Sequence, residues 1–116
     1  MEFQFKKQNP NLSKRKKDCE NLLKNNPNSV PVICEKKPNC NLESCDKTRF
    51  LVPKDLNADQ FIYLLRKRLF LNKDTNLFLI INEKDLIDGQ IQFSEIYQKF
   101  KNNEDGFLYI SYSNNI

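Results

Sequence analysis

The chain has no histidine and no tryptophan, and only two of its 116 residues are glycine. Histidine is the commonest general base and the commonest metal ligand, so its absence argues against most hydrolytic mechanisms. A glycine-rich phosphate loop is also missing, because Gly89 and Gly106 each follow an aspartate in a pattern typical of turns. We therefore expect a protein that is not an enzyme and that carries no cofactor.

The four cysteines, at 19, 34, 40 and 45, contain no Cys-x-x-Cys pair. Without histidine they also lack the second ligand type of most mixed zinc sites. A zinc site made by all four cysteines stays open at this point. Because thiols of intracellular proteins are usually reduced and buried as small apolar side chains, we expect structural cysteines and no metal.

Long hydrophobic runs are absent as well. No stretch approaches the roughly 18 apolar residues that a membrane-spanning helix needs, and Met1–Lys7 lacks the apolar segment of a signal peptide. A cytoplasmic location is therefore expected. The chain is long enough for one small core, to which nine Phe and four Tyr contribute much of the volume.

The excess positive charge lies at the N-terminal end. Residues 1–24 carry seven Lys and Arg against three acidic residues, whereas the remainder carries twelve of each sign. This boundary predicts an N-terminal helical extension over residues 1–27 and a folded domain over residues 28–116. The neutral domain argues against nucleic acid as a partner. The extension, with Phe3, Phe5 and the basic run 14–17, could contact an anionic membrane or dock on the domain, and we favour docking.

Periodicity places the elements. Apolar residues at helical spacing predict helices over about 12–24, 57–69 and 91–100, the second capped by Asn57 with Gln60 three residues later. Short apolar runs predict strands at 30–34, 50–53, 77–81 and 107–112. Because run 77–81 is apolar at every position, we expect it to lie centrally in the sheet. This order predicts an α+β fold of the β-grasp type with a mixed four-stranded sheet and packing helices.

Several blocks then become specific: Pro31-Val32-Ile33-Cys34-Glu35-Lys36, Phe50-Leu51-Val52-Pro53, Gln60-Phe61-Ile62-Tyr63, Arg66-Lys67-Arg68 and Asp105-Gly106-Phe107-Leu108-Tyr109. In this order they resemble the autophagy ubiquitin-like modifier family, which includes GABARAP and microtubule-associated protein light chain three. The resemblance runs from about Phe5 to Ser113. It implies a ubiquitin-like β-grasp fold with two small N-terminal helices and no catalytic site.

The resemblance also implies two functions. One is conjugation through a C-terminal glycine to phosphatidylethanolamine on autophagosome membranes, which involves activating and conjugating enzymes and a processing cysteine protease. The other is recruitment of cargo receptors and adaptors through short aromatic-x-x-aliphatic peptides. The protein would then be cytoplasmic, and peripheral on autophagosome or related vesicle membranes when lipidated.

Peptides of this kind add a strand to a free sheet edge that is flanked by two apolar pockets. Because side chains alternate along strand 49–52, that one strand can form a wall of both pockets. The resemblance assigns the aromatic pocket to Asp18, Leu22, Pro31, Ile33, Arg49, Leu51 and Phe107. It assigns the aliphatic pocket to Phe50, Val52, Pro53, Leu56, Phe61 and Leu64, and contacts with acidic residues beside the peptide motif to Lys47, Arg49 and Arg68.

The apolar members of these sets would be core residues in any β-grasp domain, so Arg49 is the better indicator of a groove. Three regions depart from the family: Ser29 replaces a basic residue, segment 82–89 lacks the usual proline-containing loop, and 102–104 lengthen the last turn. No glycine follows Gly106. We expect the conjugated glycine beyond Ile116; the alternative is an unconjugated, soluble peptide-binding adaptor of the same fold.

Overall fold

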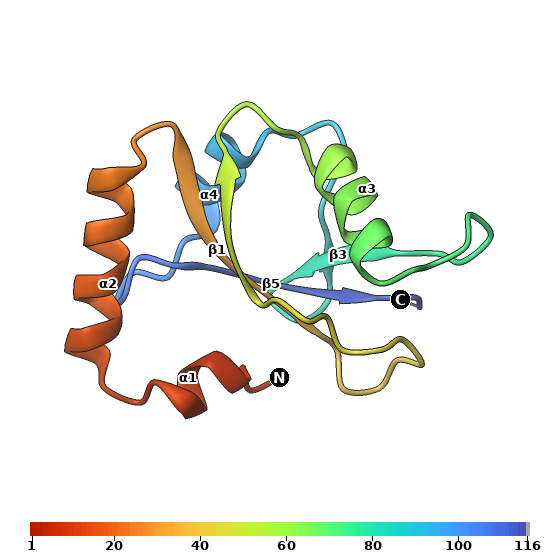
Figure 1. Ribbon diagram of the computed structural model, residues 1–116, viewed down its shortest axis with the longest axis horizontal. Helices are drawn as coiled ribbons and strands as arrows, with labels where there is room; N and C mark the ends of the chain where they lie inside the picture. The colour runs from red at the N-terminus through yellow and green to blue at the C-terminus, as the bar shows by residue number, and fades with distance from the viewer. Residues whose placement is uncertain (116) are drawn as a thin grey trace.

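A mixed β-sheet with helices packed on both faces forms the fold (Figure 1). The computed structural model describes residues 1–115. Its elements, in chain order, are α1 (Gln4–Gln8), α2 (Leu12–Asn25), β1 (Ser29–Lys36), β2 (Arg49–Pro53), α3 (Ala58–Arg68), β3 (Phe78–Ile81), β4 (Asp85–Leu86), α4 (Phe93–Phe100) and β5 (Leu108–Ser113). The strand order is β2-β1-β5-β3-β4; β1 and β5 run parallel and the other pairs antiparallel.

The main core lies between one face of the sheet and helices α3 and α4. Val30, Val32 and Cys34 of β1 point to this face, as the two-residue period of a strand requires. Phe61 of α3 and Phe93 of α4 meet there, with ring centroids 5.2 Å apart. The capping box predicted at the start of α3 is present: the Asn57 side chain accepts from the Gln60 N–H, and the Gln60 side chain accepts from the Asn57 N–H, both at 2.9 Å.

A smaller core on the opposite face holds the N-terminal helices. Cys19 of α2 packs there with Ile33 and Phe107, and Phe5 of α1 packs against Phe107 with ring centroids 5.1 Å apart. The carboxylate of Glu35 accepts the backbone N–H groups of Gln4 and Phe5, at 2.8 and 2.9 Å. The N-terminal segment therefore docks on the sheet, which is the arrangement that we favoured from the sequence.

Every helix and strand expected from periodicity is present, and the α+β ubiquitin-like fold is confirmed by the comparison reported below. The predicted position of run 77–81 is wrong, because β5 is the central strand and β3 lies one strand from the edge. The coverage of both faces, from which that position was inferred, is nevertheless present, because Leu79, Ile80 and Ile81 are all buried. Leu79 and Ile81 face the main core, whereas Ile80 faces a surface pocket that Met1 and Phe3 also line.

The strand β4 was not predicted. It has two residues, pairs with β3 alone among the described strands, and makes the sheet five-stranded. Between residues 1 and 115, no helix combines the length and the apolar character that crossing a membrane requires.

Candidate peptide-binding groove

β2 forms one edge of the sheet. The N–H of Cys34 donates to the carbonyl of Thr48 at 2.8 Å, and the N–H of Lys54 donates to the carbonyl of Asn28 at 2.9 Å. Because hydrogen-bonded and non-hydrogen-bonded pairs alternate in an antiparallel ladder, the N–H and C=O groups of Arg49 and Leu51 point away from β1. They offer an added strand two donors and two acceptors.

The groove lies between the two longest helices. Figure 1 shows α2 and α3 toward opposite ends of the molecule, with β2 between them. Along β2, Phe50 and Val52 belong to the main core, on the face that carries α3, whereas Arg49 and Leu51 lie opposite Ile33 and Pro31 of β1 and share their face. One strand therefore borders two different apolar surfaces.

The side facing α2 has a buried apolar base and more exposed borders. Ile33 and Phe107 are fully buried and Pro31 is buried, so these three predicted residues form part of the core. Leu22 is half-buried and packs against the Ile33–Phe107 cluster, and Asp18 on the same helix is also half-buried. Leu51 is 40% exposed although it is a large apolar side chain.

The side facing α3 is hollow. A pocket of about 440 Å³ is lined by Phe50, Phe61, Leu64, Leu65, Lys67 and Arg68. A second pocket of about 410 Å³ lies beside it, shares Leu64, and is also lined by Leu56 and Tyr63. Phe50 and Phe61 pack edge to face, with ring centroids 5.3 Å apart. Half of the six residues predicted for the aliphatic pocket therefore line the first hollow.

Cations surround this hollow. The Lys47 ammonium lies 5.1 Å and the Arg68 guanidinium carbon 5.9 Å from the centroid of the Phe50 ring. Arg68 also forms an ion pair with Asp46 at 3.1 Å. Hydrogen bonds from the Cys45 thiol and from Arg68 lower the pKa of the Asp46 carboxyl below its ordinary value. Asp46 therefore stays ionised and partly neutralises Arg68, the cation that an acidic peptide residue would use.

Comparison with known proteins decides which family this architecture represents. The sequence profile described as "Autophagy protein Atg8 ubiquitin like" matches residues 14–116. This chain belongs to the Atg8 family. It is similar to Autophagy-related protein 8 of Vanderwaltozyma polyspora, with 38% identity over 97% of this chain and 93% of that protein. The Aspergillus niger protein of the same name is 39% identical, with the same coverage.

The fold agrees with this assignment. The crystal structure of Trypanosoma brucei ATG8 superposes with a TM-score of 0.83 at 37% sequence identity, covering 89% of this chain and 87% of that one. Members of the Atg8 family are ubiquitin-like modifiers of autophagy and are not enzymes. The protein is accordingly a ubiquitin-like autophagy protein and not an enzyme.

The residues predicted to line the groove of this Atg8-family chain differ in how far they are exposed. Val52 is 2% exposed and belongs to the main core, and Pro53 is exposed at the end of β2. Sequence reasoning missed Leu65 and Lys67 as lining residues of the hollow beside α3. Their helical spacing from Phe61 and Leu64 was a usable signal, because residues three and four apart share a helix face.

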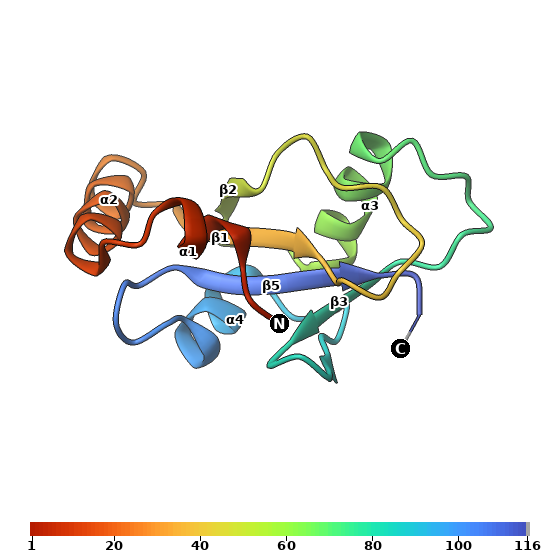
Figure 2. The ribbon, with the colours of Figure 1, turned by 90° about the horizontal axis from the view of Figure 1, so that it is seen from below.

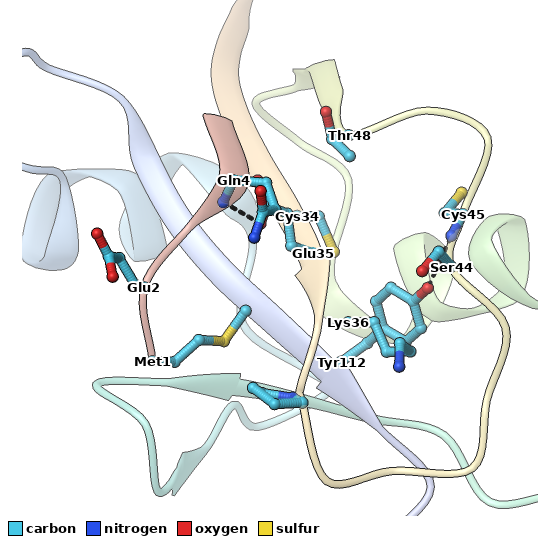
Figure 3. A pocket seen from close by; sticks show the side chains of 11 residues that line it. Met1, Glu2, Gln4, Cys34, Glu35, Lys36, Ser44, Cys45, Thr48 and Tyr112 are labelled. Carbon is cyan, nitrogen blue, oxygen red and sulfur yellow. Dashed lines mark hydrogen bonds between the residues drawn. The ribbon is translucent and has the colours of Figure 1, made fainter. Parts of the chain in front are cut away.

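A separate pocket of about 340 Å³ lies away from the groove (Figure 3). Figure 3 shows the hydrogen bond between Gln4 and Glu35 on one side of β1, with Cys34, Cys45 and Tyr112 on the other side of that strand. The Tyr112 hydroxyl accepts from the Cys45 N–H at 2.9 Å and donates to the Glu43 carbonyl at 2.7 Å. These hydrogen bonds hold the 37–48 loop against β5, so we assign the residues around this pocket a structural role.

Proposed function

We propose that this Atg8-family protein recruits cargo receptors and adaptors through aromatic-x-x-aliphatic peptides bound along β2. The observation that carries this proposal is the exposure of Leu51 beside Arg49 on an edge strand whose backbone groups point outward. An exposed, flat edge strand is an aggregation hazard unless it is charged or used for binding. Arg49 supplies the charge, and the apolar surfaces on both faces favour a peptide ligand.

In the proposed complex, the peptide pairs with β2 and places its aromatic side chain toward Leu22 and Leu51. Three residues later its aliphatic side chain enters the hollow lined by Phe50, Phe61 and Leu64. An odd spacing puts the two side chains on opposite faces of an extended peptide, which matches the two surfaces that β2 borders. Acidic residues before the aromatic one meet Lys47, Arg49 and Arg68.

The test uses a peptide of the Trp-x-x-Leu type with acidic residues before the Trp. We expect micromolar binding by calorimetry, roughly −8 kcal/mol. The Arg49→Ala/Leu51→Ala double variant should bind at least about tenfold more weakly, because Arg49→Ala removes a positive charge and Leu51→Ala removes part of the apolar wall. Circular dichroism should show both proteins equally folded.

Lys84→Ala/Leu86→Ala is the matched control. It removes the same residue types, one basic residue and one partly exposed Leu, from the turn between β3 and β4 and from β4 itself, at the opposite edge of the sheet. This control should leave binding of the acidic peptide unchanged. Equal affinity of the β2 double variant and the unaltered protein would disprove the groove.

The second part of the proposal is conjugation to phosphatidylethanolamine, by which the protein would move from the cytoplasm to autophagosome membranes. It would require the activating and conjugating enzymes and the processing protease that act on the family. Mass spectrometry of the C-terminal peptide of the endogenous protein, with and without phospholipase treatment of a membrane fraction, tests it. A tail that ends in glycine with a lipid adduct supports conjugation. A mature end at Ile116 without an adduct refutes it and leaves an unconjugated adaptor.

A further inference from the structure

The segment 82–89, which departs from the family pattern in sequence, builds a hairpin at the second edge of the sheet. Ile80 pairs with Leu86 and Ile81 with Asp85 across a tight turn. Asn82 and Glu83 both have left-handed backbone conformations, at φ 53° and 71°, which closes the turn in three residues. The segment therefore contains a short strand, β4, with its own exposed edge.

The backbone of this edge is oriented for pairing. The N–H of Ile87 donates to the carbonyl of Leu79 at 3.0 Å, so Leu79 and Ile87 form a hydrogen-bonded pair. By alternation, Ile80 and Leu86 form the next, non-hydrogen-bonded pair. The N–H and C=O of Leu86 therefore point away from β3, just as those of Leu51 point away from β1.

An apolar pocket of about 200 Å³ lies between this hairpin and α4. Its lining includes the buried Ile81 and Ile96 and the half-buried Ile87 and Ile91. Leu86 and Phe100, which also line it, are 47% and 42% exposed. Because a cavity of roughly 150 Å³ holds one benzene molecule, this pocket has room for one aliphatic side chain.

Charge decides what kind of segment fits. Asp85, Asp88 and Glu95 border the pocket, and Lys99 is its sole cation among the described residues. Lys99 pairs with Glu95 at 3.4 Å, which leaves the charges of Asp85 and Asp88 uncompensated by it. The groove at β2 has the opposite character, with Lys47, Arg49 and Arg68. Figure 2 shows β2 and the segment after β3 on opposite sides of β5.

We propose that the pocket between β4 and α4 is a second docking site, which binds an extended segment of another protein with an aliphatic side chain flanked by Lys or Arg. The aliphatic side chain fills the pocket, the backbone of the segment pairs with Leu86, and the basic side chains contact Asp85 and Asp88. Because the two edges of the sheet attract opposite charges, the protein can hold an acidic and a basic segment simultaneously. This site does not depend on the function proposed for β2.

The experiment is a titration of the isotopically labelled protein with capped seven-residue peptides, monitored by amide NMR shifts. The probes carry Lys and Arg on both sides of a central Leu, Ile, Val or Met. Saturable shifts confined to residues 81–100 are expected, and they should weaken as salt is raised from about 50 to 300 mM, because exposed charges are screened. Peptides with Glu in place of Lys and Arg should not bind there.

Three variants sharpen the test. Asp85→Lys/Asp88→Lys should weaken binding of the basic peptide at least tenfold, whereas Glu20→Lys/Asp74→Lys, the same charge change at exposed positions outside the pocket, should change it less than threefold. Leu86→Ala should weaken binding without altering its dependence on salt. Binding of the acidic Trp-x-x-Leu peptide to β2 should be the same in all of these proteins, which separates this site from the groove.

The site is refuted if none of the basic peptides shifts residues 81–100 at about 1 mM, or if Asp85→Lys/Asp88→Lys binds them as tightly as the unaltered protein. Shifts at both sheet edges that grow with protein concentration, without peptide, would show that a second copy of the chain occupies the pocket. That result would also overturn the proposal.

Discussion

Arg15 lies within the basic run of α2, yet it is 8% exposed and serves the interior. Its side chain forms an ion pair with Asp105 at 3.0 Å and donates to the Asn9 carbonyl at 2.8 Å. Asp105 also accepts from the Tyr109 hydroxyl and from the Phe107 N–H, at 2.5 and 2.9 Å. The pair therefore fixes α2 to the turn before β5, and with it the face that carries Leu22.

Asp105→Ala should lower the free energy of unfolding by about 3–5 kcal/mol, because it leaves the buried guanidinium of Arg15 without its partner. Urea denaturation measures this change. Lys16→Ala, next to Arg15 but exposed, should change stability by less than about 0.5 kcal/mol. A loss near that of the control would mean that water or another group compensates Arg15.

Asp46 would compete for Arg68 with the acidic residues of the proposed peptide. Asp46→Asn removes the charge from this exposed ion pair while keeping the shape of the side chain. We expect an acidic aromatic-x-x-aliphatic peptide to bind about two- to fivefold more tightly, with a faster association rate at low salt. Stopped-flow fluorescence of the peptide Trp measures both, since the protein has no Trp of its own. Weaker binding by the variant would show that Asp46 positions Arg68 for the ligand.

At the level of elements, the end of α3 contains a residue in a conformation that suits glycine. The N–H of Leu71 donates to the carbonyl of Arg66 and that of Phe70 to Lys67, at 3.1 and 3.3 Å, which is the Schellman pattern. Phe70 occupies its left-handed position at φ 54° with its side chain 94% exposed. Such a conformation costs roughly 1–2 kcal/mol for a residue with a Cβ.

Phe70→Gly should therefore raise the free energy of unfolding by about 0.5–1 kcal/mol, the relief of strain being partly offset by the greater freedom of glycine in the unfolded chain. The urea midpoint should increase without a change in the slope. Phe70→Ala, which keeps a Cβ, is the control and should gain much less. Destabilisation by Phe70→Gly would indicate that the exposed ring packs on a neighbour.

The elements that sequence reasoning located have local signals. The Asn57–Gln60 capping box marks α3, and β-branched or aromatic runs mark β1, β2, β3 and β5. β4 has two residues, too few for a period to show, and α1 has five and was expected from the resemblance alone. Periodicity reports whether a residue is covered but not by what. Periodicity therefore gave β3 the wrong place in the strand order. The run of basic residues 14–17 likewise gave no sign that Arg15 is buried in an ion pair.

For the groove, too, the sequence predicts which side chains share a face but not which of them are exposed. Alternation along 49–52 predicts which β2 side chains share a face, because it is a property of any strand. Whether Leu51 is exposed depends on what packs over it, and the position of α2 depends on contacts far apart in the sequence, such as Arg15 with Asp105. The distribution of buried Pro31, Ile33 and Phe107 beneath exposed Leu51 could therefore be obtained only from the three-dimensional structure.

For the molecule as a whole, burial of thiols and phenols predicts loss of stability in alkali. Burial raises the pKa of Cys19 from 9.0 to about 11, and it raises the pKa values of Cys34, Tyr97, Tyr109 and Tyr112 as well. Above pH 9 the unfolded chain therefore binds fewer protons than the native protein, so stability falls as pH rises. The contribution of Cys19 is fully present below pH 9 and is lost toward pH 11.

The urea midpoint should be nearly constant from about pH 7 to 8.5 and should decrease steeply from pH 9 to 11. Tyrosine absorbance recorded in the same samples should show phenol ionisation coinciding with unfolding. A midpoint that stays constant over the whole range would contradict the burial of these groups.

The central place of β5 also has a mechanical consequence. β5 is bonded to β1 on one side and to β3 on the other, and its C-terminal end leads out of the sheet. A force that pulls on this end along the strands while β2 is held loads the β2–β1 and β1–β5 ladders in shear, so the hydrogen bonds of each ladder must break together and not one after another. The sheet would thus transmit tension between the lipid attachment and the β2 ligand proposed above before it yields.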